Sequence, residues 1–153
     1  MGEEWIKMFK EVYGLNAEIA RFYNVYGPGE LVGSDMAAVI GIWRYAILKG
    51  QPILIHGDGE QRRDFTHVDD IVDALLRIWQ QHAWGYEFEL GRSKNYSVKD
   101  IAALYGITNI KYMDDKPGEA QETLCTDMTA HQILGWEPRL NIEDYIKDYL
   151  CKK

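Results

Sequence analysis

Short apolar runs alternate with amphipathic stretches along this chain, and the pattern changes at glycine, proline or capping residues. Residues 3–13 place Trp5, Phe9 and Val12 on one helical face, and Gly14 follows as a natural stop. The same spacing predicts further helices at 34–49, 69–82, 97–105, 127–134 and 142–150. The expected N-caps of these helices are Ser34 or Asp35, Asp69 or Asp70, Ser97, Asp127 and Asn141.

The remaining apolar runs predict strands. They lie at residues 17–25, 53–55, 65–68, 86–90 and 110–113. The run at 17–25 is apolar almost throughout, which is typical of a sheet covered on both faces. Strands that alternate with helices favour the α/β class, and the absence of an internal repeat or linker favours a single α/β domain over residues 1–153.

Composition excludes several classes of function. The chain has 17 basic and 24 acidic residues, so its net charge is −7, which argues against binding a nucleic acid backbone. No apolar run reaches the roughly 18 residues that a membrane span needs. The two cysteines lie far apart and the four histidines are scattered without metal-ligand spacing, so we expect a reduced, cytoplasmic protein without a metal site.

The stretch Gly57 to Asp70, GDGEQRRDFTHVDD, carries the clearest chemistry. Its glycines predict a tight turn, and the pair Arg62–Arg63 follows directly before a short strand and a helix. A guanidinium held between a turn and a strand suits a phosphate or pyrophosphate, because its planar fork matches anionic oxygens. The alternative is a solvated arginine pair beside an ordinary turn.

Two other patterns are weaker. Gly27-Pro28-Gly29 with Gly33 follows a strand and precedes a helix, but its spacing and its proline depart from a dinucleotide fingerprint, and no acidic residue follows at ribose distance. Tyr-x-x-x-Lys occurs at Tyr45/Lys49, Tyr112/Lys116 and Tyr149/Lys153, in a chain rich in both residue types. Neither pattern identifies a catalytic residue.

Four motifs in order resemble a known family. They are RFYNVYGP (21–28), GQPILIHGDGEQRRDFTHVDDIVDALL (50–76), KPGE (116–119) and LGWEP (134–138). Together they resemble the C-terminal half of the NAD-dependent epimerase/dehydratase family, the extended short-chain dehydrogenases that act on nucleotide sugars. The resemblance implies the C-terminal part of a Rossmann-like NAD(P)-binding epimerase fold. In that fold, 17–25 and 86–90 would be remnant parallel strands, and 53–55 and 110–113 would belong to a small mixed α/β substrate-binding domain.

The resemblance also implies roles for particular residues. Asn24 matches an asparagine that binds the substrate diphosphate, and Arg63 matches an arginine that grips the nucleotide phosphates. Phe22 falls where a side chain packs near the nicotinamide of the cofactor. Lys116 and Glu119 fall at an Arg-x-Gly-Asp pattern that contacts phosphate and ribose, although lysine lacks the bidentate fork and glutamate is longer by one methylene.

By the same resemblance, the glycine-rich NAD loop and the catalytic Tyr-x-x-x-Lys of the family lie upstream of Met1. We therefore expect the nucleotide-sugar-binding portion of a UDP-glucose 4-epimerase-like enzyme, catalytically incomplete and without bound NAD, although the intact family uses NAD. The alternatives are a non-catalytic binding or interaction module, or a gene fragment that pairs with a separate redox half. The expected partners are a nucleotide-diphosphate sugar and either a second copy of the chain or that redox half.

Overall fold

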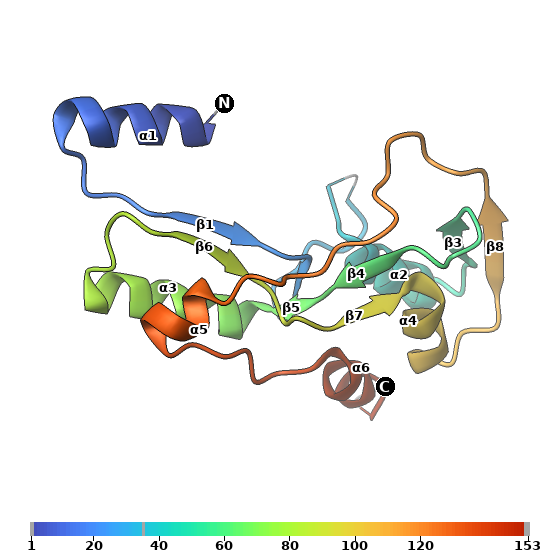
Figure 1. Cartoon of the computed structure of the whole chain (residues 1–153). Coiled ribbons are helices and arrows are strands. Elements are labelled where there is room, and N and C mark those ends of the chain that lie inside the picture. Colours follow the sequence, from blue (N-terminus) through green and yellow to red (C-terminus); the bar gives the residue numbers. More distant parts are fainter. Residues whose placement is uncertain (1, 35, 152–153) are drawn as a thin grey trace.

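The protein is described by a computed structural model that covers residues 2–34 and 36–151 (Figure 1). Its helices are α1 (Gly2–Tyr13), α2 (Val39–Leu48), α3 (Val68–Gln81), α4 (Val98–Leu104), α5 (Thr129–Leu134) and α6 (Ile142–Cys151). Its strands are β1 (Ile19–Phe22), β2 (Val25–Tyr26), β3 (Ile53–His56), β4 (Arg62–Asp64), β5 (Thr66–His67), β6 (Glu87–Leu90), β7 (Asn95–Ser97) and β8 (Ile110–Met113).

The strands form four separate pairs. β1 pairs with β6, β2 with β5 and β3 with β8, all in parallel, whereas β4 and β7 are antiparallel. The pairs follow one another along an elongated molecule, from α1 at one end to β3–β8 at the other (Figure 1). The expected α/β class with parallel strands is confirmed, and within the expected strands at 17–25 and 86–90 the segments β1 and β6 are parallel partners.

Within the described residues, two hydrophobic cores lie along this length. One gathers buried residues of α3, α5 and β6 beneath the β1–β6 pair, with Phe88, Leu90 and Trp136 among them. The other joins α2, α4 and α6 to β3, and it includes Trp43 and Ile146. The buried polar segment β4–β5 lies between the two, and its Asp64 and Thr66 are fully buried.

The expected strand at 17–25 is interrupted. Asn24 has a φ of +29°, a left-handed conformation that asparagine tolerates better than most residues. The chain therefore leaves β1 after Phe22 and resumes as β2, which pairs with β5 instead of β6. The segment expected at 65–68 is likewise divided, because Val68 already belongs to α3.

Two helix caps were predicted correctly, because in each the capping side chain directly precedes the first residue of the helix. Ser97 accepts a hydrogen bond from the amide of Asp100 in a complete capping box, and Asn141 accepts one from the amide of Asp144 at 2.8 Å. Three expected caps are wrong. The actual N-caps of α2, α3 and α5 are Ala38, His67 and Met128.

The reasons for these misses differ from helix to helix. In α3 the ring of His67 accepts from the amide of Asp69 at 3.1 Å, so Asp69 and Asp70 fall inside the first turn. Asp70 instead accepts from the amide of Leu140 at 2.9 Å. Helix α2 begins at Val39, later than its pattern suggests, so Ser34 lies well before its start. Asp35 lies outside the described residues.

No described helix is both long enough and apolar enough to cross a membrane. No group of three or more His, Cys, Asp or Glu side chains in the described part of the chain is arranged to hold a metal ion.

Candidate functional site

A cavity of about 460 Å³ lies between α2, β3, β4 and the turn at 116–119. Its volume falls in the range of small-molecule sites. One part of its wall is apolar and comes mainly from α2 and β3, with Trp43 and Ile55. The polar part includes the four residues that the sequence predicts for substrate binding: Asn24, Arg63, Lys116 and Glu119.

The two adjacent arginines of β4 make different contacts. The guanidinium of Arg62 is directed to β7, where its Nε donates to Asn95 at 2.8 Å. Arg63 lines the cavity, is only 12% exposed, and donates from Nη2 to Glu119 Oε1 at 3.0 Å. Successive side chains of a strand point to opposite faces, so only one arginine of the pair can enter the cavity.

Lys116 and Glu119 stand at the two ends of a tight turn. The amide of Glu119 donates to the carbonyl of Lys116 at 3.2 Å, and Gly118 between them has a φ of +80°. This is the conformation that glycine adopts at low cost in a type II turn. The turn brings an exposed ammonium and a carboxylate to the rim of the same cavity as Arg63.

Asn24 lines the cavity, but its amide already has two partners. Its Nδ2 donates to the carbonyl of Asp64 and to Thr123 Oγ1, both at 3.1 Å. A side-chain amide has two hydrogens, so a phosphate oxygen would have to replace one of these acceptors. The contact with Thr123 is exposed, which makes it the contact that a ligand can displace.

Asp64 is a residue whose importance sequence reasoning missed. Its fully buried carboxylate accepts from the backbone amides of Arg92, Ser93 and Cys125 at 2.8–3.0 Å. These amides belong to two distant segments, so Asp64 fixes both of them to β4, directly beside Arg63. The only available signal was its position after the arginine pair, since a lone aspartate does not reveal a buried anchor.

Phe22 is not brought into this cavity. It ends β1, pairs with Leu90, and is 50% exposed. The glycines at 27–33 also form no cradle for a dinucleotide. A Cβ on Gly27 would lie 2.6 Å from Val68, and one on Gly33 would lie 2.6 Å from the ring of Tyr45. At Gly27 and Gly33 the loop packs against its own chain, so these two glycines leave no room for the pyrophosphate of NAD, whereas Gly29 has nothing within 4 Å of an added Cβ.

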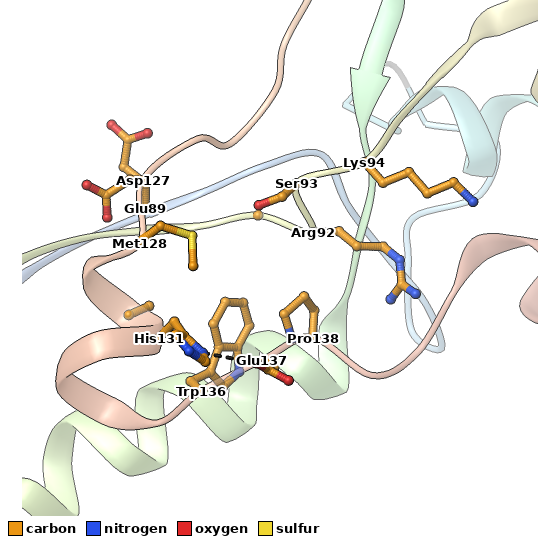
Figure 2. Close-up of a pocket in the computed structure, with 12 residues that line it drawn as sticks. Glu89, Arg92, Ser93, Lys94, Asp127, Met128, His131, Trp136, Glu137 and Pro138 are labelled. Carbon is orange, nitrogen blue, oxygen red and sulfur yellow. Dashed lines mark ion pairs between the residues drawn. The ribbon is translucent and has the colours of Figure 1, made fainter.

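A second cavity, of about 400 Å³, lies between the β6–β7 turn and α5 (Figure 2). Trp136 and Pro138 form one side, and charged groups stand around the opening (Figure 2). Most of those groups have partners within the chain. The pairs are His131 with Glu137, Lys94 with Glu143, Asp127 with Thr129, Glu89 with Tyr23, and Arg92 with the carbonyl of Leu140. The 460 Å³ cavity is the better candidate, because it gathers the four residues that the motifs indicate beside an apolar wall.

The arrangement of the 460 Å³ cavity suits a particular kind of ligand. Arg63 and Lys116 offer two positive charges to an anionic group, and the apolar wall offers a surface to a flat or apolar group. Charge-assisted hydrogen bonds from a guanidinium are stronger than neutral ones, most of all in a half-enclosed site. A ligand with a phosphate or diphosphate attached to a ring matches both parts.

Known proteins resemble this chain in sequence and in fold. A model of the NAD dependent epimerase/dehydratase family matches residues 1–91. The chain belongs to that family. Among curated members, a UDP-glucose 4-epimerase of Mycolicibacterium smegmatis is 28% identical over 95% of this chain and 48% of its own length. A putative UDP-glucose 4-epimerase of Methanocaldococcus jannaschii is 32% identical over 96% of this chain and 48% of its own.

Solved structures of epimerases share the fold. A UDP-glucose 4-epimerase of Thermotoga maritima, solved with UDP-glucose, is 28% identical, with a TM-score of 0.85 over 98% of this chain and 50% of that one. An epimerase of Methanothermobacter thermautotrophicus is 29% identical, with a TM-score of 0.88 over 95% of this chain and 45% of that one. The chain therefore spans about half the length of these family members.

One expectation from the resemblance is corrected. The sequence motifs were assigned to the C-terminal half of the family only, but the family model matches residues 1–91, the N-terminal part of this chain. The chain therefore belongs to the epimerase/dehydratase family without an assignment to its C-terminal half, and it spans about half of its relatives' length.

Proposed function

We propose that this chain binds a nucleotide-diphosphate sugar in the 460 Å³ cavity, as part of a UDP-glucose 4-epimerase-like enzyme. One observation carries the proposal. Four residues spread over 96 positions of the sequence, from Asn24 to Glu119, line a single cavity with two cations and an apolar wall. The names of similar proteins, UDP-glucose 4-epimerases among them, favour a uridine nucleotide as the first ligand to test.

Each residue has a distinct role in this proposal. Arg63 binds the diphosphate through its partly enclosed guanidinium, and Lys116 adds a second charge from the rim. The carboxylate of Glu119 accepts hydrogen bonds from the ribose hydroxyls, and its contact with Arg63 keeps that guanidinium oriented. Asn24 exchanges its exposed contact with Thr123 for a phosphate oxygen.

These contacts lie at the nucleotide and not at the sugar carbon that reacts. Their binding energy would hold the sugar in a fixed position, which is how remote groups of a substrate assist a reaction. We assign no catalytic residue within the chain.

Calorimetric titration with UDP-glucose, and with dTDP and GDP sugars, tests the proposal. We expect Arg63→Ala to weaken binding of the preferred nucleotide sugar by about 10- to 100-fold, as expected when a charged hydrogen-bond partner is lost. Arg62→Ala is the matched control, because the neighbouring arginine contacts Asn95 and not the cavity. Equal binding by the parent and Arg63→Ala would refute the site, and so would a larger loss in Arg62→Ala.

We also propose that the chain self-associates through α1. None of the twelve residues Gly2–Tyr13 is buried, although several of them are large and apolar. The exposed ones include Trp5 (57%), Val12 (63%) and Tyr13 (71%). Such a run of exposed apolar side chains is typical of an interface. Sedimentation should show dimers that Trp5→Glu weakens. A parent chain that stays monomeric at high concentration would contradict this second proposal.

A further inference from the structure

The segment of residues 27–34 connects two parts of the cavity wall. Asn24 precedes it and Ala37 to Val39 follow it, and these residues line the 460 Å³ cavity. Between them the segment lies closely on α2. A Cβ on Gly41 would lie only 2.0 Å from the carbonyl oxygen of Leu31. The segment therefore links the wall at Asn24 to the wall at the start of α2.

A buried ion pair fastens the segment to α2. Arg44 Nη1 donates to Glu30 Oε1 at 2.6 Å, and the two side chains are only 22% and 10% exposed. The hydroxyl of Tyr145, from α6, donates to the same Glu30 oxygen at 3.2 Å and accepts from Arg44 at 3.1 Å. Arg44 also lies over the ring of Tyr149, 4.6 Å from its centroid. The segment, α2 and α6 thus meet at one carboxylate, and we name this group the Glu30–Arg44–Tyr145 cluster.

This cluster is poorly suited to a purely stabilising role. Within the described residues, Glu30 Oε2 and Arg44 Nε are buried without a hydrogen-bond partner, so part of the cost of burial is not recovered. Burial opposes the charge of Arg44, yet its hydrogen bond to Glu30 and nearby groups leave the pKa of Arg44 raised. Burial, together with the charge of Glu30, raises the pKa of Tyr145 to about 12, so its hydroxyl stays protonated and able to donate. Directional contacts of this kind specify a geometry more than they stabilise a fold.

We propose that Arg44 is a positioning residue for the nucleotide cavity. Through Glu30 it holds residues 27–34 on α2, and so it supports the two wall residues on either side of this segment, Asn24 before it and Ala37 after it. Tyr145 makes α6 the third support, although α6 supplies no residue to the cavity wall. The identity of the ligand in this proposal rests on the proposed function.

Three variants separate positioning from stability. Arg44→Met removes the cation and leaves Glu30 buried and unpaired. The double variant Glu30→Leu/Arg44→Met removes both charges, and such replacements of a buried pair commonly preserve stability. Arg44→Lys keeps a charge that can reach Glu30. Lys49→Met, at the C-cap of the same helix, is the matched control for loss of a cation.

Three measurements are made on each variant: UDP affinity by calorimetry, the thermal midpoint, and amide hydrogen exchange of residues 29–34. We expect Arg44→Met to weaken UDP binding about tenfold and to speed exchange in 29–34. The double variant should recover the thermal midpoint while UDP affinity and amide protection stay low. Arg44→Lys should recover part of the UDP affinity and part of the protection. Lys49→Met should match the parent.

Two results would overturn the positioning role. One is a double variant that binds UDP as tightly as the parent. The other is unchanged protection of residues 29–34 in the double variant, and this result decides the matter even if the parent binds no UDP. Failure of the parent to bind any nucleotide sugar would refute the proposed function alone, so the two failures are distinguishable.

Discussion

Helices α1 and α2 are held to the molecule by opposite means. α2 buries Ile40, Trp43 and Ala46 in a hydrophobic core, and the indole of Trp43 donates to the carbonyl of Leu54 at 3.3 Å. α1 buries none of its residues Gly2–Tyr13 and stands apart from the rest of the chain at one end (Figure 1).

Ion pairs hold α1 instead. Arg21 of β1 bonds both Glu3 and Glu87, at 2.6 and 2.7 Å, and Lys7 lies 2.9 Å from Glu87. Exposed pairs of this kind contribute little to stability. An apolar pattern in the sequence therefore predicts that a helix forms, but it does not say whether this chain covers the apolar face.

The largest expected difference between the helices comes from their tryptophans. Trp43→Ala should destabilise the chain by about 3–5 kcal/mol, because it leaves a cavity in a core where Trp43 is 1% exposed. Trp5→Ala should cost less than about 0.5 kcal/mol in the monomer, since Trp5 is 57% exposed. Urea unfolding followed by circular dichroism at low protein concentration measures both, and equal losses would show that α1 is packed in solution.

Substitution of a glycine in each helix should show a smaller difference in stability between α1 and α2. Alanine normally favours a helix over glycine, but a Cβ on Gly41 of α2 would lie 2.0 Å from the backbone oxygen of Leu31. We expect Gly41→Ala to destabilise the chain by about 1–3 kcal/mol, as overpacking does. In α1, Gly2 has nothing within 4 Å of an added Cβ, so Gly2→Ala is the control and should be neutral or slightly stabilising. A stabilising Gly41→Ala would contradict the close approach of residues 27–34 to α2.

The smallest expected effect is local and depends on pH. The hydrogen bond to Arg21 lowers the pKa of Glu3, and hydrogen bonds to Lys7 and Arg21 lower the pKa of Glu87. Groups with a lowered folded-state pKa stabilise the folded state above the ordinary glutamate value of 4.5, and this contribution is lost as pH falls through the folded-state pKa values.

Protection factors for amide exchange in α1 should therefore fall between pH 6 and pH 3, while those in α2 change less. Arg21→Ala should lower the protection of α1 already at pH 6 and remove most of the pH dependence. If α1 kept full protection at pH 3, contacts other than these ion pairs would hold it.

Much of the local structure was predictable because its signals are local. Ser97 and Asn141 cap their helices as expected, since each cap needs only residues three positions apart. The cap expected at Asp127 is Met128 instead, although Asp127 accepts from the amide of Thr129 at 2.9 Å. The cap expected at Asp69 or Asp70 failed because the start of α3 depends on neighbouring segments. His67 ends a paired strand where α3 begins, and Asp70 is engaged by the amide of Leu140, 70 positions away.

The residues of the candidate site likewise divide into those that the sequence indicated and those that it did not. The motifs indicated Arg63, Lys116 and Glu119, and the structure places all three at one cavity. The same reasoning did not indicate Glu30 and Arg44, since an acidic and a basic residue 14 positions apart carry no signal of contact. Its placement of Phe22 near a nicotinamide stays a prediction, since Phe22 does not line this cavity and is 50% exposed.

By itself, the amino-acid sequence determined the class of fold, most helices and strands, the family, and the residue types able to bind a phosphate. The tertiary structure alone decided which arginine of the pair enters the cavity, which segment forms its wall, and which helix remains uncovered. The physical reason is that propensity, capping and periodicity act over a few residues. Burial, pairing and close approach depend on segments that meet only when the chain folds.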